Sequence, residues 1–182
     1  MKPTMTLQRA LTPAGAIVRG AAAGLAGTLA MDLLWYRRYR GGGGDDGFLA
    51  WELSAGTTGY EQAGAPAQVG RRVVEGYLQR ELAPESARTM NNAVHLLTGV
   101  SWGLVHGILM ASAGSRRARH GLATGATAWA ASYALLAPAG LYKPMREYPP
   151  AVLWKDLSAH LVFGLATGAA FRALTGDRLR RR

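Results

Sequence analysis

The strongest constraint on this chain is a stripe of polar and small residues that occurs twice, each time inside an apolar stretch. The first copy reads Asn91-x3-His95-Leu96-x2-Gly99-x3-Gly103, and the second reads Asp156-x3-His160-Leu161-x2-Gly164-x3-Gly168. Because helical residues four apart lie on one face, each copy predicts a helix with a polar group, a histidine and two glycines on a single face. Such a face on an apolar helix is typical of closely packed membrane helices.

Four apolar stretches, at residues 14–36, 92–114, 120–142 and 150–173, are predicted to cross a bilayer. A helix needs about 20 mostly apolar residues to cross the hydrocarbon core. The first stretch contains Arg19 and Asp32 and the fourth contains Lys155 and Asp156, but charges near helix ends can extend to the interface. We therefore predict one all-α domain, an integral membrane four-helix bundle.

The distribution of basic residues predicts the orientation of the chain. With four spans, both termini lie on one side, which then holds eleven basic residues and, of the acidic ones, only Asp177. The basic residues are Lys2, Arg9, Arg19, Arg116, Arg117, Arg119, Arg172, Arg178 and Arg180 to Arg182. The positive-inside rule favours cytoplasmic termini in a bacterial inner membrane, although Arg37, Arg38 and Arg40 on the other side oppose it.

The net charge of +10 does not indicate a nucleic-acid partner, because many of the arginines flank apolar runs instead of marking a basic groove on a soluble fold. The expected partners are the lipid bilayer and, within it, a second copy of the chain or another membrane protein.

The long segment 37–91 is predicted to be a partly helical extracytoplasmic loop. Its sequence suggests a short helix near 48–53 and an amphipathic helix over 67–82 that follows Pro66. We expect this amphipathic helix to lie on the membrane surface or to cap the bundle. Its apolar stripe consists of Val69, Val73, Tyr77, Leu78 and Leu82.

A polar pocket is expected near the outer face of the membrane, where the two stripes place their histidines at similar depth. Its predicted members are Asp32, Asn91, His95, Asp156 and His160. They could transfer protons, bind a small polar ligand, or hold a haem or metal through His95 and His160. They could equally form structural hydrogen bonds that fix the register of the helices.

No resident cofactor is predicted, because the chain has no cysteine and no His-Glu-x2-His motif. Haem stays open as an alternative.

Small residues recur at helical spacing and predict close helix–helix packing of the glycine-zipper kind. The glycines concerned are Gly20, Gly24, Gly99, Gly103, Gly107, Gly164 and Gly168. The first and third stretches also share a pattern, Arg19-Gly20-x3-Gly24 and His120-Gly121-x3-Gly125, so the chain can be read as two related helical hairpins.

Three motifs together resemble uncharacterised small polytopic membrane proteins of bacteria, loosely the YagU-type inner-membrane family. They are Val69-Gly70-Arg71-Arg72, Asn91-Asn92-x2-His95-x3-Gly99-x2-Trp102-Gly103-x3-Gly107 and His160-Leu161-x2-Gly164-x3-Gly168, within residues 60–172. The resemblance implies an inner-membrane protein of about four spans and transfers no catalytic residue.

The leading functional hypothesis is a transporter-like or accessory membrane protein with a His/Asp pocket. The alternatives are a b-type haem or metal protein and a structural subunit of a membrane complex. The sequence contains no nucleophile elbow, nucleotide fingerprint or catalytic triad, which favours a role other than that of an enzyme.

Overall fold

The structure, a computed structural model, describes residues 11–115 and 117–176, and its regular elements in these ranges are all helical. Four long helices dominate it: α1 (Pro13–Gly41), α4 (Ala87–Ser112), α5 (His120–Leu136) and α6 (Pro150–Thr175). The segment between α1 and α4 contains α2 (Phe48–Glu52), α3 (Ala65–Tyr77) and the short turn η1 (Pro84–Ser86). A second short turn, η2 (Met145–Glu147), precedes α6. The predicted all-α class is therefore confirmed.

Parts of the orientation prediction cannot be placed in this structure. Residues 1–10, Arg116 and residues 177–182 lie outside the described residues, and they carry seven of the eleven basic residues and Asp177. Arg19, Arg117, Arg119 and Arg172 are described.

Three helices in the described ranges are long and apolar enough to cross a membrane, namely α1, α4 together with η1, and α6. α5 is shorter, with 17 residues, and ends at Leu136 instead of near residue 142. Pro138 has no amide N–H to continue the helical hydrogen bonds, and Gly140 then adopts a left-handed conformation with φ of 68°. The predicted third span is thus a 17-residue helix followed by a turn.

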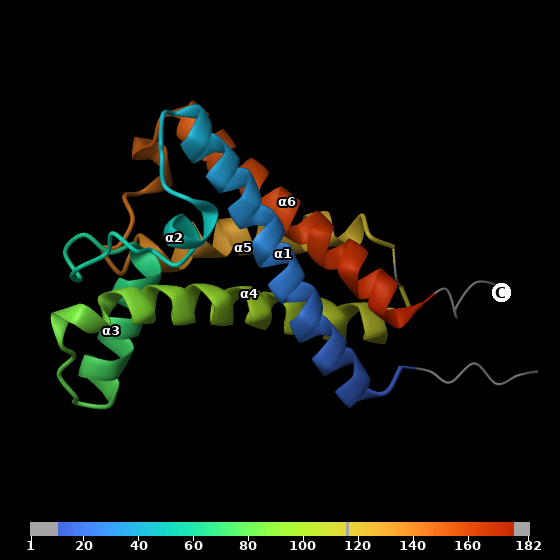
Figure 1. Ribbon diagram of the computed structural model, residues 1–182. Helices are drawn as coiled ribbons and strands as arrows, with labels where there is room; N and C mark the ends of the chain where they lie inside the picture. Colours follow the sequence, from blue (N-terminus) through green and yellow to red (C-terminus); the bar gives the residue numbers. More distant parts are fainter. Residues whose placement is uncertain (1–10, 116, 177–182) are drawn as a thin grey trace, which may run out of the picture.

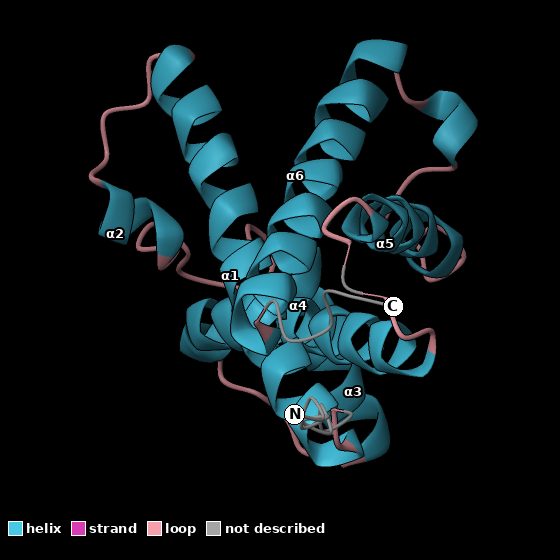
Figure 2. Cartoon of the chain, turned by 90° about the vertical axis from the view of Figure 1, so that its right-hand side faces the viewer, coloured by secondary structure: helices cyan, strands magenta, loops and turns pink. Residues whose placement is uncertain are grey.

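The long helices cross one another, as Figure 1 shows for α4 lying across α1. α1 packs on both α4 and α6, and α5 packs on α6. Beyond their contact, the C-terminal half of α1 and the N-terminal half of α6 diverge into a V (Figure 2). Arg38 of α1 spans this opening, because its guanidinium donates to the Lys155 carbonyl oxygen at 2.7 Å and to Ser158 Oγ at 2.8 Å.

Glycines form the contact surfaces of the two crossings. A Cβ atom built on Gly103 would lie 2.5 Å from the Cα of Gly24, so α1 and α4 touch through their backbones. A Cβ on Gly164 would lie 2.6 Å from the amide nitrogen of Gly125, so α5 and α6 touch in the same way. Of the other glycines expected at contacts, Gly20, Gly24, Gly99 and Gly107 face a neighbouring helix, and Gly168 faces Ala118 in the turn between α4 and α5.

The two crossings are alike but shifted by one helical turn relative to the sequence repeat. The sequence repeat aligns Gly99 with Gly164. In the structure, the counterpart of Gly164 is instead Gly103. Gly103 faces Gly20 and Gly24 in the same way that Gly164 faces Gly121 and Gly125. The shift puts the backbone of His160 at the crossing of α5 and α6, where its carbonyl faces Gly125. His95 lies one helical turn away from the corresponding point at the crossing of α1 and α4. The two histidines, which the repeat makes equivalent, therefore occupy different positions relative to the two crossings.

The interior contains small residues, and many of the large apolar side chains lie outside. The buried residues of α1 are alanines, glycines, Thr28 and Asp32. Leu25, Leu29 and Leu33 are spaced by four on the opposite face of α1 and are 40 to 55% exposed. A soluble protein rarely exposes such a continuous apolar surface, whereas lipid-facing helices require one.

The amphipathic helix of the loop begins and ends earlier than predicted and packs through a different face. It covers Ala65–Tyr77, because Gln79 takes a left-handed conformation with φ of 51°. Its buried residues are Ala67 and Gly70, and Gly70 lies against Met90 of α4. Much of the predicted apolar stripe, including Val73 and Tyr77, faces outward.

Candidate functional site

A hydrogen-bonded pair of ionisable side chains joins α1 to α4. His95 Nε2 lies 3.0 Å from both Oδ1 and Oδ2 of Asp32. The Asp32 side chain is only 7% exposed, so water solvates its charge poorly and the imidazole is its main observed partner. The pair becomes an ion pair when the histidine is protonated.

A third ionisable group, Glu52, approaches this pair from α2, and the sequence analysis did not identify it. α2 is fixed to α1 by aromatic contacts, since the Tyr36 ring lies 5.2 Å from Phe48 and 5.5 Å from Trp51. It is fixed to α4 at the residue after Glu52, because Arg88 Nε and Asn92 Nδ2 donate to the Leu53 carbonyl at 2.7 and 3.0 Å. These contacts hold the Glu52 carboxyl beside Asp32.

The surroundings of Glu52 favour its neutral form. Burial raises the pKa of the Glu52 carboxyl from 4.5 to about 7; the negative charge of Asp32 raises this pKa further, and His95 opposes the rise. Two carboxyl groups and an imidazole this close share protons as a unit, because ionising one changes the cost of ionising the others.

A cavity of about 370 Å³ lies beside the Asp32–His95 pair, and His95 is one of its lining residues. Its walls come from α1, α3, α4, α5 and α6 and are mostly apolar, with Met31, Trp35, Trp102 and Phe163 among them. The lining residues whose side chains carry a polar atom are Thr28, Trp35, His95, Thr98, Trp102, Ser132, Tyr142, Asp156 and His160.

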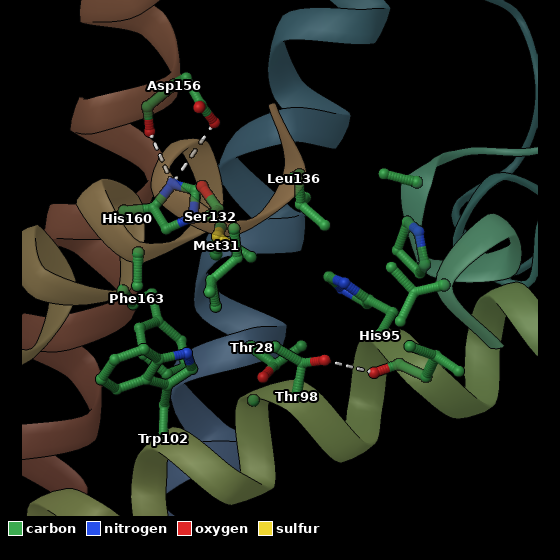
Figure 3. Close-up of a pocket in the computed structure, with 18 of the residues that line it drawn as sticks. Thr28, Met31, His95, Thr98, Trp102, Ser132, Leu136, Asp156, His160 and Phe163 are labelled. Atoms are coloured by element: carbon green, nitrogen blue, oxygen red, sulfur yellow. Dashed lines mark hydrogen bonds and ion pairs between the residues drawn. The ribbon is translucent and has the colours of Figure 1, made fainter. Parts of the chain in front are cut away.

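The second histidine lines the same cavity from α6. His160 Nδ1 lies 3.0 Å from the Asp156 carbonyl oxygen and 3.4 Å from Asp156 Oδ1, one turn earlier in the helix. Figure 3 shows His160 and His95 on opposite sides of the cavity, with Met31 between them. The cavity thus has an ionisable pair on each side, Asp32–His95 and Asp156–His160.

Two predicted pocket residues do not line the cavity, and of these Asp32 is bonded to His95, which does. Asn91 does not line the cavity, because its Nδ2 donates to Ser54 Oγ at 3.0 Å and its amide faces the loop. Its role is to hold the segment after α2 against α4. Asn91 lies one helical turn before His95, where the loop folds over the end of α4.

The third histidine of the spans is part of the packing. His106 is 1% exposed, its Nδ1 lies 2.8 Å from Thr124 Oγ1 of α5, and its ring stacks edge to face on Phe171 at 5.6 Å. Phe171 is the residue that the sequence repeat pairs with His106. Two equivalent positions of the repeat therefore meet between α4 and α6.

No group of three or more His, Cys, Asp or Glu residues is arranged to hold a metal ion within residues 11–115 and 117–176. The haem alternative would use His95 and His160, which face one cavity but are each already bonded to an aspartate.

The chain matches no protein-family model, no curated protein and no solved structure in comparisons with each. The resemblance to the YagU-type family thus stays a prediction from sequence motifs.

Proposed function

We propose that this protein is a transporter-like or accessory membrane protein that binds a small amphipathic molecule in the cavity between its long helices. The observation that carries the proposal is the cavity itself, about 370 Å³ of mostly apolar space with an ionisable pair on each side. Ligand sites of about 300–1,000 Å³ commonly combine apolar walls with a few polar groups that orient the ligand.

Proton binding is proposed to accompany ligand binding. His95 belongs both to the cavity wall and to the buried pair with Asp32, so a ligand that bonds the imidazole changes the partners of the carboxylate. Glu52 provides a further carboxyl group whose pKa, about 7, allows it to exchange protons near neutral pH.

The proposed setting is a bacterial inner membrane that the chain crosses four times, with both termini in the cytoplasm. The direction of the helices supports this count. α1 begins beside the end of α6, since Arg19 Nε donates to the Leu174 carbonyl at 3.1 Å, and beside the end of α4, where Gly107 faces Ala16. α4 and α6 therefore run the same way, and α5 carries the chain back between them.

Native mass spectrometry of the purified protein tests for an occupant of the cavity. Ala131→Phe adds a ring to the cavity wall formed by α5 and should abolish a bound small-molecule mass that the wild type carries. Ala130→Phe is the matched control, because Ala130 is exposed and does not line the cavity. Equal retention of the bound molecule by both variants would contradict the proposal.

A visible absorption spectrum of the same preparation tests the haem alternative. A b-type haem held by His95 and His160 would give a strong band that His160→Ala abolishes. The colourless protein expected here would leave the small amphipathic ligand as the better hypothesis.

A further inference from the structure

The two histidines that line the cavity are held so that each offers it a hydrogen-bond acceptor. His95 Nε2 lies 3.0 Å from both oxygens of the Asp32 carboxylate, which only accepts, so this nitrogen carries the proton of the neutral ring. His160 Nδ1 lies 3.0 Å from the Asp156 carbonyl oxygen and donates for the same reason. Each neutral imidazole therefore keeps one unprotonated nitrogen that accepts, Nδ1 in His95 and Nε2 in His160.

The hydroxyl groups of the lining have also used the one proton that each can donate. Thr98 Oγ1 donates to the Val94 carbonyl oxygen at 2.7 Å, and Ser132 Oγ donates to the Trp129 carbonyl oxygen at 2.7 Å. Thr28 donates in the same way to a carbonyl of its own helix, one turn earlier. Each of these hydroxyl oxygens is left with lone pairs only, so it can accept a hydrogen bond but not donate a second one.

The donors among the lining side chains are fewer. They are the indole N–H groups of Trp35 and Trp102 and the phenol of Tyr142. In the described part of the chain, no Lys or Arg belongs to the lining, whereas Asp156 does. An anionic ligand would therefore meet a carboxylate without an ammonium or guanidinium group to compensate its charge, which is unfavourable in a mostly apolar cavity.

Basic residues near the cavity are occupied elsewhere. Arg38 and Arg72 donate to backbone carbonyl oxygens, and Lys143 and Lys155 are exposed, so water screens their charges. Asp32, which lies behind His95, is only 7% exposed, so its negative charge is screened much less. The lining and its buried support therefore favour a ligand that is positively charged and rich in donors.

We propose that the ligand of the cavity is an amphipathic organic ammonium ion. This inference rests on the proposed function, because it assigns the chemical class of the ligand in the same cavity. The N–H groups of the ligand donate to the unprotonated nitrogens of His95 and His160, and the carboxylates of Asp32 and Asp156 stabilise its charge. An ammonium group has donors and no acceptor, which complements this lining. The apolar body packs among aromatic residues such as Trp102, whose ring face also attracts cations.

Isothermal titration calorimetry of the full chain in nonionic detergent tests the ligand class with probes that share one apolar body. The probes are diphenylpropylamine, its trimethylammonium counterpart, diphenylpropanol and diphenylpropanoate. The titrations use mildly alkaline pH, where an unperturbed imidazole is neutral and an aliphatic amine is still charged. The amine should bind the wild type about tenfold more tightly than the alcohol, because a charged donor forms the stronger hydrogen bond. The trimethylammonium probe, which has no N–H, should also bind more weakly than the amine, and the carboxylate should bind most weakly.

Two variants assign the contacts. Asp156→Asn should weaken binding of the amine about tenfold and leave binding of the alcohol unchanged, because it removes the charge and keeps the size. His160→Phe should weaken binding of the amine by a similar factor, because it removes an acceptor. Asp45→Asn is the matched control, since Asp45 is exposed in the loop after α1 and does not line the cavity. An equal loss in Asp45→Asn, or unchanged affinity in Asp156→Asn, would overturn the assignment.

Ala131→Phe distinguishes failure of this inference from failure of the proposed function, because it fills the cavity whatever the ligand is. Preferential binding of the alcohol or the carboxylate that Ala131→Phe abolishes would overturn the ammonium ion and keep the cavity as a ligand site. Amine binding that Ala131→Phe retains would overturn both. If a variant does not fold, the wild type alone decides. Failure of the amine to bind it, or equal binding of the amine and trimethylammonium probes, would overturn the inference.

Discussion

The pair Asp32–His95 is the contact at the residue scale on which the candidate site depends. Two oxygens of a carboxylate that is 7% exposed share one imidazole nitrogen at 3.0 Å. Breaking a buried pair by removing one partner costs more than the pair contributes, because the remaining charge is left without solvation. The two residues should therefore respond to mutation as one unit.

We expect His95→Ala to destabilise the protein by about 3 kcal/mol, since it leaves Asp32 buried without its partner. His95→Gln should cost about 1 kcal/mol, because an amide N–H can still donate to the carboxylate. Adding Asp32→Asn to His95→Ala should recover part of the loss. Thermal unfolding in detergent measures all three, and additive effects of the two substitutions would contradict the coupling.

The raised pKa of Glu52 predicts how the stability of the folded protein depends on pH. Its pKa is about 7 in the folded protein and 4.5 without burial, so between these values the folded state binds a proton that the unfolded state lacks. The stability that this group contributes is therefore fully present below pH 4.5 and is lost as the pH rises through about 7. Glu52→Gln should flatten the pH dependence of the unfolding temperature in this window, and an unchanged slope would exclude the effect.

At the element scale, the glycine contacts determine whether the helices can cross. A methyl group at Gly103 would meet the backbone of α1, and one at Gly164 would meet the backbone of α5. Neither neighbour is a flexible side chain, so the helices would have to separate and lose their close contacts over the whole crossing.

Gly103→Ala and Gly164→Ala should each lower the unfolding temperature in detergent markedly, by about 2 kcal/mol or more in free energy, as overpacking typically does. Gly41→Ala is the control, because nothing lies within 4 Å of a Cβ built there and alanine favours helix. Stability as high as the wild type in both crossing variants would mean that the crossings are absent in solution.

Much of the helical structure could be predicted from the sequence, because an apolar run and the spacing of small residues are local properties. The helix starts at Pro13 and Pro150 and the glycine faces of α1, α4 and α6 are of this kind. The one-turn shift between the two crossings is not a local property. The repeat that aligns Gly99 with Gly164 fits either register of the helices, and packing between segments distant in sequence decides between the two registers.

The sequence analysis did not identify Glu52 for a similar reason. Glu52 lies in a five-residue helix with no periodic signal, and only the contacts of Leu53 with Arg88 and Asn92 bring it to the pair. Asp32, His95, Asp156 and His160 could be named from the sequence because a charged or titratable group in an apolar stretch stands out by itself.

At the scale of the whole molecule, the direction of the helices supports the proposed topology of four spans. α4 and α6 both run toward the end where α1 begins, as the contacts of Gly107 with Ala16 and of Leu174 with Arg19 require. Two parallel spans that follow each other in the chain need a return crossing between them. The 17 residues of α5 reach about 25 Å at the helical rise of 1.5 Å per residue, close to the thickness of the hydrocarbon core.

Single-cysteine labelling tests this topology, and the chain has no native cysteine to interfere. We choose Ala14 in the first turn of α1, Gly47 before α2 and Ala113 at the end of α4, all of which are exposed. A charged thiol reagent added outside intact cells should label the Gly47→Cys variant, because the arginines at the other end favour the cytoplasm. The Ala14→Cys and Ala113→Cys variants should be labelled only after the membrane is opened. Labelling of both Gly47→Cys and Ala113→Cys from outside would show that α4 does not cross, and labelling of Ala14→Cys but not Gly47→Cys would reverse the orientation.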